Sequence, residues 1–306
     1  MSRISVIGNV NIDLLVWPAA ELPPPGAEVQ VETIGMRAAG SAGNSALALA
    51  RLGQVPNVAG CVGGDLFGRF IIEELAAAGI AEGVTVLPEE PTGITIAFQS
   101  PARDRSFLTL LGSLESFGAA MVHEETLAAE FVLFCGYFTL PALRGEPTLD
   151  LMQRVRAAGG STFFDSDWDP GGWSQESSKE IATLLPFVDV FLPSEDEARG
   201  LTGLEDPEAA ARNLQQISGG QVVVKLGADG CVAIGPGEEF RVPAPPVTVR
   251  DTTGAGDSFN GALMYALSAG AEWHEALRFA TRLASTVVSR SSENRYPTLE
   301  EIIPLA

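Results

Sequence analysis

Short apolar segments alternate with amphipathic segments along most of the chain. Six apolar segments have the length of buried strands, at residues 4–8, 57–62, 131–135, 161–164, 188–192 and 221–226. Patterns of helical period lie between them, at residues 43–52, 66–78, 149–158, 180–185 and 207–217, and two more follow at 255–269 and 272–289. Nearly continuous apolar strands separated by helices are typical of a parallel sheet that is covered on both faces. We therefore predict an α/β fold.

Two segments interrupt this alternation of strands and helices. Residues 28–37 and 92–111 alternate between apolar and polar with a period near two, and neither is followed by a helix. We predict that they form a small β-sheet lying over one edge of the main sheet as a lid, built from about residues 14–38 and 92–112. The alternative is that they are extra edge strands of the main sheet. Because no linker divides the chain, we predict a single domain over residues 1–306.

The charge of the chain excludes several classes of partner. It carries 19 Lys and Arg against 39 Asp and Glu, a formal net charge of −20, so binding to nucleic acid or to an anionic membrane surface is not expected. The longest apolar runs, such as residues 131–143, are shorter than the ~20 residues that span a bilayer. Cys61, Cys135 and Cys231 lie far apart in apolar contexts, which predicts buried free thiols and a cytoplasmic protein.

The segment over residues 251–263 carries the clearest chemical signal. Gly254, Ala255 and Gly256 lead into an apolar helix, and small residues at a helix start let unpaired backbone N–H groups surround an anion. Asp257 lies in the first turn, where a carboxylate would repel the anion unless it served to take a proton from a hydroxyl attacking phosphorus. The alternative is a glycine-rich turn in which Asp257 is only an N-terminal helix charge. Neither a Walker P-loop nor the protein-kinase motifs occur.

A second group of polar residues lies in the N-terminal part of the chain. Gly40 and Asn44 open a helix, and Asn44 offers both a donor and an acceptor. Asn11 and Asp13 follow the first strand, and ligands bind at the carboxyl ends of strands in open parallel sheets. An amide beside a carboxylate suits neighbouring sugar hydroxyls. The alternatives are tight helix packing with a capping Asn for the first pair, and Asx turns for the second.

Together these segments resemble the ribokinase-like sugar kinase family of the phosphofructokinase-B type. Residues 39–63 and 251–264 match both signatures of the family in the expected order, and the resemblance covers essentially the whole chain. It implies a three-layer α/β/α ribokinase-like fold with a mostly parallel central sheet and a small β-sheet lid. It also implies ATP and Mg²⁺ as cofactors and, in many members, K⁺. Dimers formed lid to lid are common in the family, so a homodimer through the lid is a candidate assembly.

The resemblance implies a role for each matching residue. Asp257 matches the catalytic base, and Gly254, Ala255 and Gly256 match the anion hole. The positions that contact the sugar are matched by Asn11, Asp13, Gly40 and Asn44. The positions beside the nucleotide are matched by Lys225, Gly227, Gly230 and Thr253. Asp251 and Thr252 fall where the family binds a monovalent cation, and Glu197 falls where it organises Mg²⁺ indirectly.

The chain departs from the family pattern at a few positions. Ser194 stands in place of Asn in the segment that contains Glu197, where it also forms a helix capping box. Asp167 and Asp169 replace an Asn and an Arg, and that arginine holds the carboxylate in relatives that act on sugar acids. A keto-acid sugar is therefore less expected as the acceptor, unless Arg103 or Arg105 in the lid compensates.

The sequence thus predicts ATP-dependent phosphorylation of a primary hydroxyl on a small sugar. The alternative within the same fold is a nucleoside kinase of the adenosine type. A non-catalytic sugar- or nucleotide-binding protein would need a damaged base or anion hole, and here both are intact. A Rossmann dehydrogenase is a weaker alternative still, because no GxGxxG motif follows the first strand.

Overall fold

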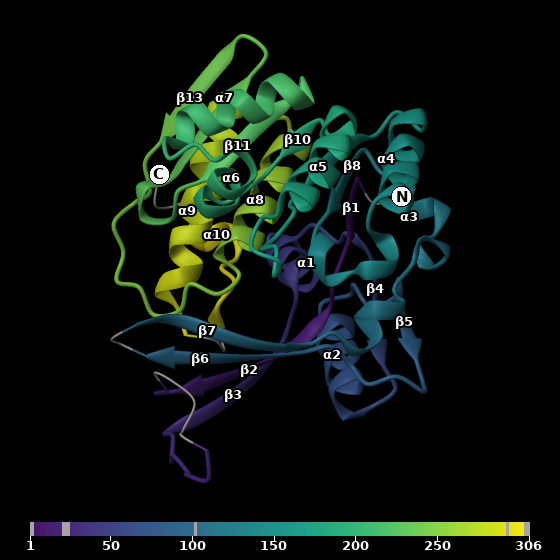
Figure 1. Ribbon diagram of the computed structural model, residues 1–306, viewed down its shortest axis with the longest axis vertical. Helices are drawn as coiled ribbons and strands as arrows, with labels where there is room; N and C mark the ends of the chain where they lie inside the picture. The colour runs from purple at the N-terminus through teal and green to yellow at the C-terminus, as the bar shows by residue number, and fades with distance from the viewer. Residues whose placement is uncertain (1–2, 20–24, 101–102, 292–293, 303–306) are drawn as a thin grey trace.

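The main structural element of the protein is a nine-stranded sheet with helices on both faces (Figure 1). The computed structural model describes residues 3–19, 25–100, 103–291 and 294–302. The strand order is β13-β12-β11-β10-β9-β8-β1-β4-β5. These strands are β1 (Ile4–Ile7), β4 (Asn57–Gly63), β5 (Val84–Leu87), β8 (Phe131–Phe134), β9 (Ser161–Phe164), β10 (Val190–Phe191), β11 (Gln221–Lys225), β12 (Cys231–Gly235) and β13 (Glu238–Val242). Strand β12 pairs antiparallel with both of its neighbours, β11 and β13. The remaining neighbours pair parallel, with Val6 opposite both Val58 and Leu133.

Helices cover both faces of this sheet and bury two separate apolar cores. One core includes side chains of α1 (Ser41–Arg51), α2 (Leu66–Ala77), α8 (Ala255–Ser268), α9 (Trp273–Ser289) and α10 (Leu299–Ile302). The other includes side chains of α3 (Glu124–Leu127), α4 (Glu146–Ala157), α5 (Gln175–Leu184), α6 (Glu195–Thr202) and α7 (Pro207–Ser218). Side chains along β1 point alternately to the two faces of the sheet, so this strand contributes to both cores. Ile4 and Val6 belong to the first core and Ile7 to the second. The predicted three-layer α/β/α fold is confirmed.

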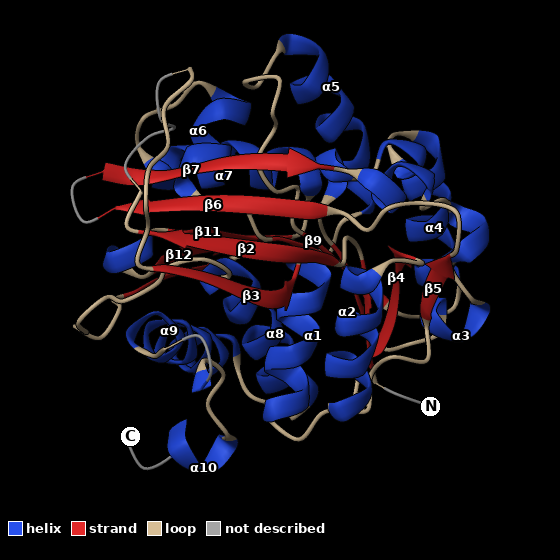
Figure 2. Ribbon diagram, turned by 90° about the horizontal axis from the view of Figure 1, so that it is seen from below, coloured by secondary structure: helices blue, strands red, loops and turns tan. Residues whose placement is uncertain are grey.

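A separate four-stranded sheet has the order β3-β2-β6-β7, and Figure 2 shows its strands side by side. It consists of β2 (Asn11–Trp17), β3 (Thr33–Ala39), β6 (Ile94–Ser100) and β7 (Arg103–Leu110). Strand β2 pairs antiparallel with β3 and parallel with β6. These strands form a sheet of their own and do not extend the edge of the main sheet, so the prediction of a separate small sheet is confirmed.

Some predicted boundaries and placements were wrong. Asn11 and Asp13 do not end the first strand of the main sheet, because β1 stops at Ile7 and both residues belong to β2 of the small sheet. Strands β5, β12 and β13 and the first residues of α5 were not predicted. The three cysteines are free and buried, as predicted. Among the described helices, none is long and apolar enough to cross a bilayer.

Candidate active site

The turn before α8 has the geometry of an anion-binding helix start. Gly254 caps the helix in the left-handed region with φ 69°, which a residue with a side chain rarely adopts. The amides of Gly256 and Asp257 follow in the first turn, where a helix offers no acceptor of its own. The amide of Ala255 donates to the carbonyl of Thr252 at 3.2 Å, so it is partly engaged within the turn. The helix dipole adds positive potential at this end.

Asp257 is buried beside Asn44, which lies in the first turn of α1. The Asn44 amide donates to a carboxylate oxygen of Asp257 at 2.8 Å, and the Ser45 hydroxyl donates to its backbone carbonyl at 3.0 Å. Burial raises the pKa of Asp257 to about 6, and Asp165 adds to the increase, while the hydrogen bond from Asn44 opposes it. A carboxylate with this pKa is ionised at neutral pH and still basic enough to take a proton.

A cluster of carboxylates surrounds Asp257. One oxygen each of Asp165, Asp167 and Asp257 lie within 4.8 Å of one another. The Lys225 ammonium donates to Asp165 at 2.6 Å, and the Asn260 amide donates to the same oxygen at 2.5 Å. Asp165 and Asn260 were not identified from the sequence, although Asp165 lies two residues before Asp167, at which the chain departs from the family pattern.

The charge of this cluster shifts the pKa of its members. Burial, together with Asp165 and Asp257, raises the pKa of Asp167 well above its usual range. Burial lowers the pKa of Lys225, but Asp165 and Glu197 raise it by more. The cluster therefore carries an excess of negative charge that one lysine only partly balances.

Glu197 faces the same cluster from the start of α6. Its carboxylate accepts the backbone N–H of Ser194 at 2.8 Å, and the Ser194 hydroxyl accepts the N–H of Glu197, which is the predicted capping box. Burial raises the pKa of Glu197 to about 7, and the charge of Asp165 contributes. The capping role and the position beside the carboxylate cluster thus occur together.

These carboxylates fit the Mg²⁺ that the family implies. Carboxylate oxygens are the ligands that Mg²⁺ prefers, and three of them converge here within 4.8 Å. Asp165 and Asp167 would hold the ion near the phosphates, and an indirect action of Glu197 on the ion stays a prediction.

Two of the residues predicted to bind the acceptor, Asn11 and Asp13, lie in one chain of hydrogen bonds. The Asn9 amide donates to Asn11 at 3.2 Å, and the Asn11 amide donates to Asp13 at 3.2 Å. Gly40 has φ 86°, and a Cβ at this position would be 2.3 Å from the Asn9 carbonyl oxygen, so only glycine fits. Burial raises the pKa of Asp13, although Arg37 opposes this. Arg105 lies in β7, but its side chain is outside the described part of the chain, as is that of Arg103.

Arg37 links the small sheet to the loop before α8. Its guanidinium donates to Asp251 at 2.8 Å and to Asp13 at 3.2 Å. The other oxygen of Asp251 accepts the N–H of Thr253 at 2.9 Å. Burial raises the pKa of Asp251, but Arg37 and the hydrogen bonds with Thr253 together lower it by more and leave it at about 2. Asp251, which is predicted to bind a monovalent cation, thus bonds a guanidinium in this structure.

A cavity of about 450 Å³ opens beside the turn and contains most of the residues predicted to bind the nucleotide. Its lining residues include Lys225, Gly227 and Gly230, as well as Ala255 and Gly256 from the start of α8. Its remaining lining is mostly apolar, which suits the base and ribose of a nucleotide. Thr252, predicted at the cation, lines this cavity, whereas Thr253, predicted at the nucleotide, does not.

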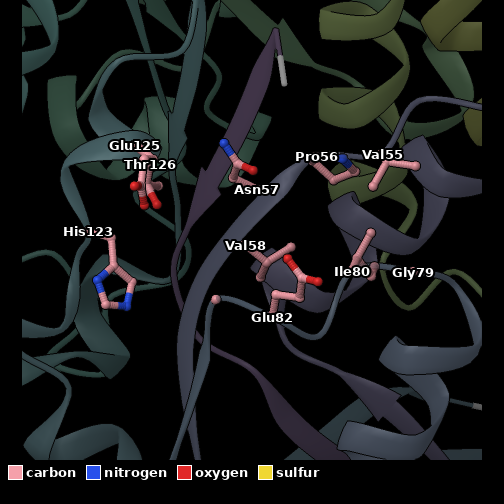
Figure 3. A pocket seen from close by; sticks show the side chains of 11 residues that line it. Val55, Pro56, Asn57, Val58, Gly79, Ile80, Glu82, His123, Glu125 and Thr126 are labelled. Atoms are coloured by element: carbon pink, nitrogen blue, oxygen red, sulfur yellow. The ribbon is translucent and has the colours of Figure 1, made fainter. Parts of the chain in front are cut away.

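A second cavity, of about 320 Å³, lies elsewhere in the molecule (Figure 3). Asn57, Glu82 and His123 are among its lining residues. Asn57 begins β4, so this cavity lies at the amino end of a parallel strand, opposite the end at which open α/β sheets bind ligands. None of the predicted site residues lines it.

Comparison with known proteins agrees with this geometry. A profile described as pfkB family carbohydrate kinase matches residues 1–299. A 5-dehydro-2-deoxygluconokinase from Shouchella clausii is 30% identical, covering 98% of this chain and 94% of the relative. The structure of Arabidopsis thaliana ribokinase complexed with ribose and ATP has a TM-score of 0.84 at 26% identity, covering 100% of this chain and 99% of that one.

A second solved structure is similar over an equal length. It is an Escherichia coli protein described as ribokinase II in complex with ATP and Mg²⁺, with a TM-score of 0.85 at 26% identity, covering 99% of this chain and 98% of that one. The family profile matches nearly the whole chain, and the fold is ribokinase-like. The anion turn before α8 is intact, so all three findings indicate the same family. The chain belongs to the pfkB family of carbohydrate kinases and is an ATP-dependent carbohydrate kinase.

Proposed function

We propose that this kinase transfers the γ-phosphoryl group of ATP to a primary hydroxyl of a small sugar, with Asp257 as the general base. The observation that carries the proposal is the position of Asp257. Its buried carboxylate bonds Asn44 on the acceptor side, and it lies one residue beyond Gly256, which lines the nucleotide cavity. A base placed between the two substrates can take the hydroxyl proton as the oxygen attacks phosphorus.

The other residues of the site have complementary roles in this proposal. Asn11, Asp13 and Asn44 orient the sugar hydroxyls, and Gly40 lets the acceptor approach the backbone. The amides at the start of α8 stabilise the charge that develops on the transferred group. Mg²⁺, when bound, neutralises charge on the phosphates of ATP.

A panel of acceptors tests the proposal. Purified enzyme with MgATP is given ribose, fructose, a 5-dehydro-2-deoxy sugar acid and adenosine, and ADP release and the phosphorylated product are both measured. We expect one sugar to raise ADP release by about 10² or more over the rate without acceptor. A clear preference for adenosine would favour the nucleoside-kinase alternative. ATP turnover that no acceptor stimulates would contradict the proposal.

We further propose that the small sheet is a lid and that two copies of the chain pair through it. Five large apolar side chains on β3 and β7 are exposed: Ile34, Met36, Phe107, Leu108 and Leu110. Exposed apolar groups that gather on one sheet are typical of an interaction surface. Sedimentation equilibrium should give twice the mass of the chain for the native protein and the mass of one chain for Met36→Glu. A native protein that sediments as a monomer at micromolar concentration would contradict the proposed dimer.

We also retain a cytoplasmic location as a proposal. It is supported by three free, buried cysteines, which suit a reducing compartment.

A further inference from the structure

Two arginines that the sequence analysis did not single out, Arg37 and Arg295, lie at the loop that precedes α8. Arg37 bridges Asp251 in this loop and Asp13 on β2, and all three side chains are at most 14% exposed. Its bonds tie the acceptor side of the site to the phosphoryl-binding turn. Because Arg37 and Asp251 are 214 residues apart in the sequence, the contact exists only in the folded chain.

Arg295 lies against the same turn. It is 5% exposed, and its guanidinium rests 5.4 Å from the centre of the Tyr296 ring. A Cβ added to Gly254 would be 2.7 Å from Nη2 of Arg295 and 2.9 Å from the amide nitrogen of Asn44. The guanidinium is therefore packed directly against the first residue of the anion turn.

The terminal nitrogens of Arg295 are buried and have no hydrogen-bond partner among the described residues. A buried guanidinium without partners is costly to keep, so its charge must be balanced by its surroundings. That charge lowers the pKa of both Asp13 and Asp257. Arg295 thus influences the site through the electrostatic effect of its positive charge, and its terminal nitrogens make no hydrogen bond to the described residues.

The loop does not fit the monovalent cation that the family implies. Both carboxylate oxygens of Asp251 already have partners, one in the Arg37 guanidinium and one in the N–H of Thr253. Arg295 adds a second positive charge next to Gly254. A further cation in this loop would be repelled by two guanidinium groups in a poorly solvated region.

We propose that Arg37 and Arg295 are fixed internal cations that replace the monovalent cation beneath the phosphoryl-binding turn, and that this kinase works without K⁺. Both are positioning residues. Arg37 holds the turn through Asp251. Arg295 packs against Gly254, and its neighbour Tyr296 donates to Asn44 at 2.8 Å, which in turn donates to the base Asp257 at 2.8 Å. The kinetic part of the proposal rests on the proposed function.

The experiment compares potassium, sodium and tetramethylammonium chlorides at one ionic strength. For the native enzyme, we expect kcat/KM to agree among the three salts within about twofold. Arg295→Ser removes the charge and opens space for an ion. We expect its kcat/KM to fall about tenfold or more in tetramethylammonium and to recover in part with K⁺. Arg295→Lys keeps the charge and should remain independent of the salt. Arg278→Ala, at an exposed position on α9, is the matched control and should behave as the native enzyme.

A second readout needs no turnover. K⁺ should raise the Tm of unliganded Arg295→Ser and leave the Tm of the native protein unchanged relative to tetramethylammonium. Native kcat/KM or native Tm that rises with K⁺ would overturn the proposal, as would an Arg295→Ser enzyme that equals the native one in tetramethylammonium. If no acceptor is phosphorylated, the proposed function fails, while the melting comparison still decides whether the arginines replace the cation.

Discussion

Replacing Asn44 by Ala should move the pH at which the base ionises. The Asn44 amide donates to the Asp257 carboxylate at 2.8 Å, and both side chains are buried. This hydrogen bond stabilises the charged form of Asp257 and so lowers its pKa, which burial has raised to about 6. Without Asn44 the carboxylate loses that support, and its pKa must rise.

The size of the change follows from the strength of such a bond. A hydrogen bond to a charged group contributes about 1.5–3 kcal/mol, and one pKa unit corresponds to about 1.4 kcal/mol. The pKa of Asp257 should therefore rise by about 1–2 in Asn44→Ala. Because the base acts only when ionised, the acid limb of kcat/KM against pH should move from near pH 6 to about pH 7–8.

The assay is initial-rate kinetics between pH 5 and 9 with saturating MgATP. Asn44 is also predicted to contact the acceptor, so the KM for the sugar will rise as well. A loss of sugar binding alone, however, lowers kcat/KM at every pH and does not move the acid limb of the profile. Ser45→Ala is the matched control, since the Ser45 hydroxyl donates to the backbone carbonyl of Asp257 and not to its carboxylate. An acid limb that stays in place in Asn44→Ala, or that moves equally in Ser45→Ala, would refute the reasoning.

Two further substitutions test the acceptor side and the loop before α8. Gly40→Ala would place a Cβ 2.3 Å from the Asn9 carbonyl oxygen, at a residue with a φ of 86°. We therefore expect KM for the sugar to rise about tenfold or more. Nucleotide affinity, measured by calorimetry, should be retained. A normal sugar KM would contradict the close approach. Burial raises the pKa of Asp251, but Arg37 and Thr253 together lower it to about 2, so Asp251 stabilises the fold above pH 4 and loses that contribution as the pH falls toward 2. The stability gap between native protein and Asp251→Asn in urea should therefore shrink by about 1 kcal/mol from pH 6 to pH 3, and a constant gap would exclude this ion pair as its source.

The main sheet and the anion turn could be predicted because their signals are local. Apolar runs such as residues 131–135 specify buried strands, and the small residues before Asp257 specify a helix start, whatever the rest of the chain does. The two cores confirm that these runs are covered on both faces. The assignment of Asn11 and Asp13 to β1 failed because sequence cannot show that the chain leaves one sheet and enters another within a few residues.

The electrostatic part of the site depends on contacts between distant segments. Asn44 and Asp257 are 213 residues apart, and Arg37 and Asp251 are 214 residues apart. No local pattern marks Arg37 or Arg295, since isolated arginines in a strand or near the end of a chain are ordinary surface residues. Only the fold brings them to the turn before α8, where burial gives their charges an effect that they would lack in water.

The role of Asp257 is tested most directly by Asp257→Asn, which keeps the shape of the side chain and removes its basicity. Turnover of the best acceptor and affinity for a non-hydrolysable ATP analogue are measured on the same preparation. We predict that kcat falls by about 10²–10⁴ while the affinity for the analogue stays within about threefold of the native value. Turnover close to that of the native enzyme would contradict the account, because proton removal would then not depend on this carboxylate.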